Sequence, residues 1–160
     1  MGLFSACATT QPQNPNEMKE LNLKNCSGPM LNNLREGLWL CKNTKGLITI
    51  EAAYVAGLKN GLVRLWRDDG SLDSESHWIG GKLEGRLTNY FSNGRKFIET
   101  IYKQQSIDGT MTEWFENGNK KSELNYKEGA LNGYVREWSE NGDLVSEEKY
   151  LNGQLQLPQK

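Results

Sequence analysis

Residues 109–129 read GTMTEWFENGNKKSELNYKEG, and the glycines of this stretch belong to a pattern that returns every 24 residues. A glycine opens each of five rows without an insertion or a deletion, at Gly37, Gly61, Gly85, Gly109 and Gly133. A second glycine follows nine positions later in every row, at Gly46, Gly70, Gly94, Gly118 and Gly142. A third follows 20 positions after the row start, at Gly57, Gly81, Gly129 and Gly153, with Gln105 in its place in the middle row. A fixed period of this length predicts a repeat array.

Two further kinds of residue keep the same period. A glutamate column occupies one position of every row, at Glu51, Glu75, Glu99, Glu123 and Glu147. A first aromatic column stands five positions after the row start in four rows, at Trp66, Tyr90, Trp114 and Trp138, with Lys42 in the first row. A second aromatic column stands three positions after the glutamates, at Tyr54, Trp78, Tyr102, Tyr126 and Tyr150. Each row thus places the same kinds of side chain at the same positions, as a repeat protein does.

The dipeptide that ends in the second glycine predicts a tight turn. It is Asn-Gly or Asp-Gly in four rows, and a type I′ hairpin turn favours these pairs because both central residues need positive φ. The third glycine and the next row start bracket a second, wider turn, as in residues 129–133. Each row then holds two strands of about six to nine residues, and no window shows a helical apolar period. We therefore expect an all-β fold, an elongated single-layer antiparallel meander of about ten strands.

Apolar columns indicate which side of the sheet is buried. Residues two positions after the row start, such as Val63 and Leu87, and 22 positions after it, such as Leu83, are apolar in nearly every row and are expected to share one face. The intervening row-start glycine is expected on that face, where it leaves room for an aromatic ring over the backbone. The two aromatic columns break strict alternation, which predicts a bulge or a strand end.

The combination Gly-x-x-x-x-[Trp/Tyr]-x-x-[Asn/Asp]-Gly and Glu-x-x-Tyr-x-x-Gly resembles the MORN repeat. It resembles in particular the bacterial variant often labelled as the antitoxin component of a toxin–antitoxin system. Residues 109–118 and 123–129 carry the pattern in full, and the resemblance extends from residue 37 to about residue 155. It implies an elongated, twisted single-sheet array that serves as a scaffold and docking surface. Row 37–60 lacks the first aromatic residue and row 85–108 has Gln105, so local irregularity is expected in both.

Residues 1–25 stand apart from the repeats. The run Leu3-Phe4-Ser5-Ala6-Cys7 resembles the end of a bacterial lipoprotein signal peptide, where small residues precede a cysteine that is lipidated. Residues 9–19 are polar, contain two prolines and suit a flexible tether. We therefore expect lipidation of Cys7, an ordinary thiol being the alternative. The β-repeat domain is expected to span residues 26–160, with a half repeat at 26–36 before the first row.

Two other cysteines are predicted to form a disulfide. A turn centred near residue 34 places Cys26 opposite Cys41 on neighbouring strands, within the separation of about 4.4–6.8 Å between Cα atoms that a disulfide requires. The bond would close a loop of about 15 residues and contribute about 3 kcal/mol on the chain-entropy model. Two reduced cysteines in a cytosolic protein are the alternative. Together with the lipoprotein-like N-terminus, the disulfide points to an oxidising compartment.

Composition narrows the classes of partner. The 160 residues suit one domain, and 20 acidic against 19 basic side chains give a net charge of −1, which argues against a nucleic-acid partner. No polybasic cluster supports lipid-headgroup binding, so membrane contact is expected only through a lipid on Cys7. The single histidine excludes a multi-histidine metal site, and no run of 18 apolar residues could span a bilayer as a helix. We expect neither a metal nor another cofactor.

The glutamate column is the strongest candidate for catalysis. Carboxylates two strands apart lie about 9.5 Å apart, at the upper edge of the range for an inverting glycosidase pair. A uniform column is more typical of a solvated acidic ladder, or of a partner for turn N–H groups and neighbouring lysines. His77 has no cysteine or histidine companion and is expected at an exposed strand position, with Asp73 and Ser74 on an ordinary strand. We therefore expect no enzyme activity.

The aromatic columns form a candidate binding face for a sugar or an apolar protein segment. The alternative is that the rings pack across strands as the core of a single sheet. The candidate face comprises Trp66, Trp78, Tyr90, Tyr102, Trp114, Tyr126, Trp138 and Tyr150. The terminal strands, near Cys26 and around residues 149–157, expose edges that predict edge-to-edge self-association, although Pro158 blunts the second edge.

Three functions are compatible with these features. The favoured one is a non-catalytic exported lipoprotein, anchored in the cell envelope at the outer membrane or the cell surface, whose array docks a protein or an envelope component. The second is a cytosolic antitoxin-like binding module. The third is a hydrolase of peptidoglycan or polysaccharide that uses the carboxylate column.

Overall fold

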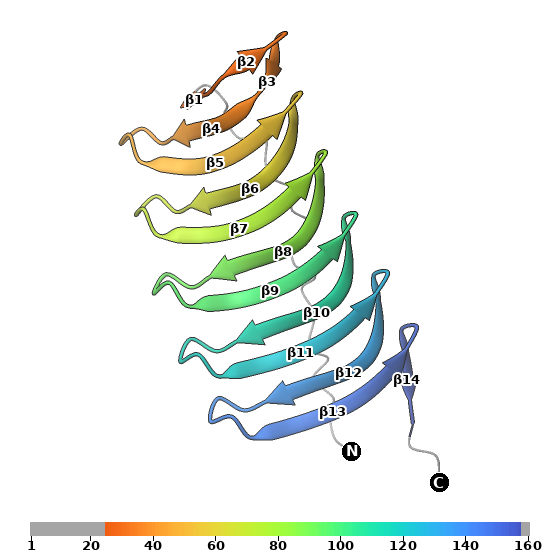
Figure 1. Cartoon of the computed structure of the whole chain (residues 1–160). Helices are drawn as coiled ribbons and strands as arrows, with labels where there is room; N and C mark the ends of the chain where they lie inside the picture. The colour runs from red at the N-terminus through yellow and green to blue at the C-terminus, as the bar shows by residue number, and fades with distance from the viewer. Residues whose placement is uncertain (1–24, 158–160) are drawn as a thin grey trace.

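The computed structural model describes residues 25–157 and contains one long antiparallel sheet (Figure 1). Twelve strands pair in the order β1-β4-β5-β6-β7-β8-β9-β10-β11-β12-β13-β14, and β2 and β3 form a separate two-stranded sheet. The strands are β1 (Cys26–Ser27), β2 (Met30–Leu31), β3 (Leu34–Arg35), β4 (Gly37–Lys42), β5 (Ile48–Val55), β6 (Leu58–Trp66), β7 (Leu72–Ile79), β8 (Lys82–Tyr90), β9 (Lys96–Lys103), β10 (Ser106–Trp114), β11 (Lys120–Lys127), β12 (Ala130–Trp138), β13 (Leu144–Leu151) and β14 (Gln154–Gln156). The all-β meander is confirmed, with β4 to β13 as the strands of the five rows.

The hairpins follow one another along the array, and strands pair in the order of the sequence. From β5 to β13, strands of eight and nine residues alternate. Figure 1 shows a bent ribbon with the broad turns along one long side and the narrow turns along the other. Residues at the same place in successive rows therefore form lines across the sheet.

The predicted assignment of the two turns was wrong, because the narrow turns are those at the third glycine. Val55 pairs with Leu58 and leaves a two-residue turn in which Ala56 (φ 49°) and Gly57 (φ 80°) both have positive φ. At the second glycine only the glycine has positive φ. There the Arg67 N–H donates to the Ser71 carbonyl at 2.9 Å and closes a three-residue loop. This geometry is a type I turn followed by a left-handed glycine.

The Asn or Asp before the second glycine stabilises this broader turn through its side chain. Its side-chain oxygen accepts the N–H of the residue two positions later in three rows: Asp69 from Ser71 at 2.8 Å, Asn93 from Arg95 at 2.9 Å, and Asn117 from Asn119 at 2.8 Å. Such a bond selects Asn or Asp without requiring positive φ at that residue. The dipeptide thus located the turns correctly but indicated the wrong backbone type.

The narrow turns are joined from row to row by backbone hydrogen bonds. The residue at the third-glycine position donates its N–H to a carbonyl of the preceding hairpin, that of the residue two positions before a row start. The bonds are Gly57 to Arg35, Gly81 to Lys59, Gln105 to Leu83, Gly129 to Ile107 and Gly153 to Leu131, at 2.8–3.0 Å. Gln105 makes this bond with φ at 74°, so the row that lacks the glycine keeps the same backbone.

The row-start glycines lie in bulges and face away from the buried apolar columns, which corrects the prediction for them. Between β5 and β6 the register shifts from Ala52↔Val63 to Tyr54↔Lys59, so that Ala53 faces the bulge around Gly61. A Cβ placed on Gly61 would lie 3.3 Å from the Ala53 Cβ. The space above a row-start glycine is thus taken by the side chain that stands eight positions earlier in the chain, not by the predicted aromatic ring.

Buried side chains gather on one side of the sheet, which we call the core face. Its central cluster is Ile50, Ala52, Val63, Trp78, Leu83, Leu87 and Tyr102. Val63, Leu83 and Leu87 come from the two apolar columns, so the prediction that these columns share a face is confirmed. The side chains that alternate with the core residues along the strands, including the five column glutamates, lie on the opposite side, which we call the glutamate face.

The predicted disulfide joins β1 to β4. Cys26 pairs with Cys41 in the ladder, and their sulfur atoms are bonded. The Cα atoms lie 3.9 Å apart, closer than the expected range. Next to this bond, the Arg35 guanidinium lies 4.7 Å from the Trp39 ring centre and 5.1 Å from that of Tyr54. The disulfide and this cation–π contact together fix the N-terminal strands to the first row.

Candidate functional site

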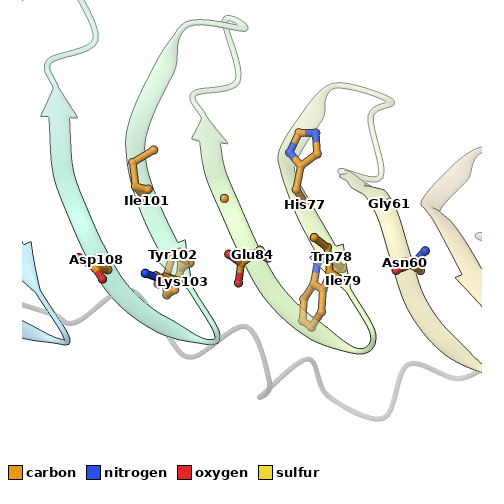
Figure 2. Close-up of a pocket in the computed structure, with 11 residues that line it drawn as sticks. Asn60, Gly61, His77, Trp78, Ile79, Glu84, Ile101, Tyr102, Lys103 and Asp108 are labelled. Carbon is orange, nitrogen blue, oxygen red and sulfur yellow. The ribbon is translucent and has the colours of Figure 1, made fainter.

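An open hollow of about 700 Å³ lies beside the narrow turns of the middle rows (Figure 2). His77 of β7 and Ile101 of β9 line it, and each lies next to the row-start glycine of the following strand. By strand alternation they share the glutamate face with Ile79 and Lys103. The other lining residues are Asn60, Gly61, Glu84, Gly85 and Asp108, together with Trp78 and Tyr102, whose rings belong to the opposite face of the sheet. Gly61 and Gly85 contribute only backbone to this lining.

The lining of the hollow mixes apolar and charged groups. Ile79 is 63% exposed there. Glu84 accepts the Gln104 N–H at 2.7 Å, and Asn60 accepts the Gly80 N–H at 3.2 Å, so these two side chains hold the narrow turns. Lys103 and Asp108 add one charge of each sign. Such a surface suits a partner with an apolar group flanked by polar ones.

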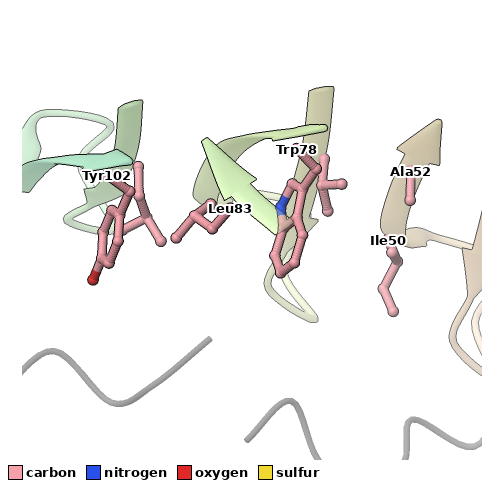
Figure 3. Packing of buried hydrophobic residues seen from close by; sticks show 7 residues of the cluster. Ile50, Ala52, Trp78, Leu83 and Tyr102 are labelled. Atoms are coloured by element: carbon pink, nitrogen blue, oxygen red, sulfur yellow. The ribbon is translucent and has the colours of Figure 1, made fainter. Parts of the chain in front are cut away.

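The structure separates the eight residues of the predicted aromatic face. The second aromatic column lies on the core face, where Trp78 is 3% and Tyr102 6% exposed (Figure 3). The first aromatic column lies on the glutamate face, as its contacts with column glutamates and their lysines show. The residues on the core face are Trp78, Tyr102, Tyr126 and Tyr150, and those on the glutamate face are Trp66, Tyr90, Trp114 and Trp138. These rings therefore do not form a single stacking platform.

The core-face rings are engaged in packing. The Trp78 Nε1–H donates to the Ser76 hydroxyl at 2.8 Å, and the Lys59 Nζ lies 4.3 Å from the centre of the Trp78 ring. Burial, and secondarily the positive charge of Arg35, lowers the pKa of Lys59. Burial likewise raises the pKa of the Tyr102 and Tyr126 phenols. At Trp78 and Tyr102, the structure therefore matches the alternative in which aromatic rings form the core.

The glutamate column is paired with basic side chains. Arg64 lies between Glu51 and Glu75, at 3.3 and 3.4 Å. Arg136 lies between Glu123 and Glu147, at 3.5 and 2.6 Å. Lysines bridge this column to the glutamate-face rings: Lys96 lies 2.5 Å from Glu99 and 5.5 Å from the Trp114 ring centre, and Lys120 lies 2.5 Å from Glu123 and 5.7 Å from the Trp138 ring centre. The expectation that neighbouring lysines partner these carboxylates is thus confirmed for Glu99 and Glu123.

Tyr90 connects the glutamate face across two rows. Its hydroxyl donates to the Glu75 Oε1 at 2.7 Å, and its backbone carbonyl accepts from Arg67, which also pairs with Asp73 at 2.7 Å. Burial and the hydrogen bond to the Glu75 carboxylate raise the pKa of Tyr90 to about 12. This phenol therefore stays protonated and acts as a hydrogen-bond donor throughout the physiological range.

The remaining candidates for chemistry lie apart from one another. His77 is exposed, as predicted, and faces the opposite side of β7 from the buried Ser74. Asp73 forms an ion pair with Arg67. Within residues 25–157 no group of three or more His, Cys, Asp and Glu side chains is arranged to hold a metal ion. In the same part of the chain, no helix has the length and hydropathy needed to cross a bilayer. Cys7 lies outside the described residues, so its lipidation stays a prediction.

The comparisons with known proteins concern the C-terminal rows. Residues 107–128 and 131–152 match the family model described as MORN repeat variant. These two segments are therefore similar to MORN repeats. The earlier rows share the 24-residue period and the glycine columns of these two segments. No curated protein matches the chain.

A solved structure, that of TarM, resembles part of the array. It has 12% identity, covers 64% of this chain and 20% of its own, and superposes with a TM-score of 0.41. The chain thus spans about a fifth of the length of that protein. A likeness of this degree carries no argument about function.

Sequence reasoning missed the hollow, although the sequence holds a signal for it. One position before each row start carries a side chain with an acceptor oxygen: Glu36, Asn60, Glu84, Asp108 and Asn132. Three of them accept an N–H from the narrow turn 20 positions later, namely Glu36 from Ala56, Asn60 from Gly80 and Glu84 from Gln104. A polar column next to a glycine column would have located the bulge and its open floor.

Proposed function

We propose that this protein is a non-catalytic binding module whose MORN-type array docks a protein partner or a component of the cell envelope. The hollow on the glutamate face carries this proposal, because it leaves Ile79 largely exposed in a lining that also holds charges of both signs. Catalysis by two carboxylates needs unlike surroundings for the acid and the nucleophile or base. Each of the five column glutamates instead pairs with an arginine or a lysine, which favours binding over hydrolysis.

We further propose that the module is an exported lipoprotein of the cell envelope. The Cys26–Cys41 disulfide supports this location, because such bonds persist mainly in oxidising compartments. The resemblance of residues 3–7 to a lipoprotein signal supports it independently. A cytosolic antitoxin-like binding module is the competing function, and it requires free thiols at both positions.

Site-directed photocrosslinking in cells tests the docking surface. A photoreactive amino acid at Ile79 in the hollow is expected to give a discrete adduct, whereas one at Lys45, an exposed broad-turn residue, is expected to give none. Replacement of Ile101 by Asp, which adds a charge inside the hollow, should abolish the Ile79 adduct. A protein that folds normally and yields no adduct at Ile79, or equal adducts at both sites, would contradict the proposal.

Fractionation and thiol labelling test the location. The native protein is expected in the membrane fraction, incorporating labelled fatty acid only while Cys7 is present, and Cys7→Ser should release it. Cys26 and Cys41 should resist alkylation until a reductant is added. Cytosolic protein with both thiols alkylated directly would select the antitoxin-like module instead.

A further inference from the structure

The last full strand of the array leaves most of its outer edge uncovered. The inner edge of β13 pairs with β12 from Gly133↔Tyr150 to Trp138↔Leu144. On the outer edge, β14 pairs only with Lys149, Tyr150 and Leu151. Within residues 25–157, no strand lies against the outer edge of residues 144–148. Figure 1 shows β14 beside one end of β13, with the rest of that strand open.

The last ladder also differs from the ladders inside the array. Between β11 and β12 the register shifts where the row-start glycine bulges out. Between β13 and β14 no shift occurs, and the residue 24 positions after Gly133 is Leu157, which is 77% exposed. Along the open edge, β13 has a bulge at Val145, where its register with β12 shifts, and residues 146–148 beyond it pair regularly with β12. A regular segment with an open edge is a geometry that accepts an added strand.

The charge along this edge defines the kind of strand that fits. Residues 140–148 contain four acidic side chains and no basic one. Inside the array, a column glutamate faces a neighbour on each side: Glu123 lies opposite Thr112 and Arg136. Glu147 lies opposite Arg136 on its inner side, and β14 does not reach its outer side. Because opposite charges across strands stabilise a sheet, a cationic side chain is favoured at the open position.

The same charge disfavours a second copy of this edge as the occupant. Two β13 edges paired with each other would bring two acidic segments together, and like charges facing across strands destabilise a pair. Leu144 and Val145 are 55% and 66% exposed at this edge and offer apolar contact to the incoming strand. The fitting partner is therefore an extended segment that alternates apolar and cationic residues.

We propose that the outer edge of β13 binds an extended, cation-bearing segment of a partner protein as an additional antiparallel strand, with a basic side chain opposite Glu147. Backbone hydrogen bonds from residues 144–148 would supply the affinity, and Glu147 would supply the register and the charge preference. This edge site is separate from the docking hollow, which lies on the face of the middle rows. Either of the two proposals can therefore be wrong without the other being wrong.

A peptide taken from the array itself is a suitable probe. Residues 61–67 read GLVRLWR and include the second part of β6, in which Arg64 already lies between two column glutamates. We expect this peptide, labelled with fluorescein, to bind the purified 160-residue chain in an anisotropy titration. Glu147→Lys in the protein, or Arg64→Glu in the peptide, should each weaken binding about tenfold or more, and the two changes together should restore it.

Two controls keep the result specific. Glu128→Lys makes the same charge change in an exposed narrow turn and should leave the affinity unchanged. Hydrogen exchange should show slower exchange at residues 144–148, and nowhere else, when the peptide is bound. Absence of binding, protection at another strand, equal binding by the charge variants, or a wild-type dimer formed through this edge would each overturn the proposal.

Discussion

At the scale of single residues, a row can replace its third glycine only with a residue that keeps the backbone hydrogen bond made at that position. The third-glycine position requires a left-handed conformation, because its N–H must reach the carbonyl of the preceding hairpin. Four rows meet this requirement with glycine and the middle row meets it with Gln105 at φ 74°. A residue with a Cβ is strained in this region, so the middle row holds a local cost that the others avoid.

Replacement of Gln105 by glycine is therefore expected to stabilise the protein. Relief of the left-handed strain is worth about 1–2 kcal/mol, and the greater freedom of glycine in the unfolded chain offsets about 0.5–1 kcal/mol of it. We expect a net gain of about 0.5–1 kcal/mol in the free energy of unfolding, measured by urea denaturation. The reverse change, Gly129→Gln, should cost a similar amount, and a loss of stability in Gln105→Gly or a gain in Gly129→Gln would contradict this account.

Tyr90 gives the protein a distinct response to alkaline pH. A free tyrosine ionises near pH 10, whereas burial and the Glu75 carboxylate raise the pKa of Tyr90 to about 12 in the fold. Between these values the unfolded state loses a proton that the folded state keeps, so stability falls as the pH rises. The difference in unfolding free energy between wild type and Tyr90→Phe should be constant below about pH 10 and should decline from there towards pH 12. A difference that stays constant up to pH 12 would show that burial and the Glu75 carboxylate do not raise the pKa of Tyr90 in the fold.

At the scale of elements, the bulge at each row start couples one strand to the next. The row-start glycine of one strand and the side chain eight positions before it occupy the same space. A Cβ on Gly109 would lie 2.9 Å from the Ile101 Cβ, whereas a Cβ on Gly85 would lie 3.9 Å from that of His77. The two glycines thus share a role in the fold but differ in the room around them.

Alanine at these two glycines should separate steric crowding from backbone strain. Gly109→Ala is expected to destabilise the protein by about 2–4 kcal/mol, from strain at φ 136° and from displacement of Ile101. Gly85→Ala adds strain without the close contact and is expected to cost about 1–2 kcal/mol. Thermal unfolding monitored by circular dichroism compares the two, and equal losses would mean that the contact with Ile101 relaxes freely.

The sequence predicted the strands well and their turns and faces less well, for identifiable reasons. Period and glycine columns located β4 to β13, since each turn recurs at a fixed position. The turn types were exchanged because an Asn-Gly pair suits both a type I′ turn and a type I turn with a left-handed glycine. The two aromatic columns were predicted to share one face because the alternation of side chains between the two faces does not continue through a turn. The length of the loop decides which face the side chains of the next strand occupy. Predicting the hollow requires knowing where the strands bulge, and the 24-residue period alone does not show this.

At the scale of the whole molecule, the array is uniform in sequence period but not in burial. Eight of the nine buried apolar side chains of residues 25–157 lie between Ile50 and Tyr102, and Leu124 is the ninth. The disulfide and the Arg35 contacts secure the N-terminal end of this buried region. The C-terminal end has the short strand β14 and several exposed apolar residues, including Leu151 and Leu155. The stability of a repeat protein is the sum of the stabilities of its rows and of the interfaces between neighbouring rows. The difference in burial along the array therefore makes its two ends differ in stability.

Substitutions at one position of three rows should reveal this gradient. Leu83, Leu131 and Leu155 belong to the same apolar column, and Leu83 is 1% exposed whereas Leu155 is 45% exposed. Leu83→Ala is expected to cost about 2–5 kcal/mol because it leaves a cavity in the core cluster, Leu155→Ala less than about 1 kcal/mol, and Leu131→Ala an intermediate amount. Native-state hydrogen exchange should show the same order, with amides of β6 to β9 protected longest and those of β13 and β14 shortest. Equal protection along the array would mean that the rows unfold as one cooperative unit, because neighbouring interfaces would then outweigh the differences in burial between rows.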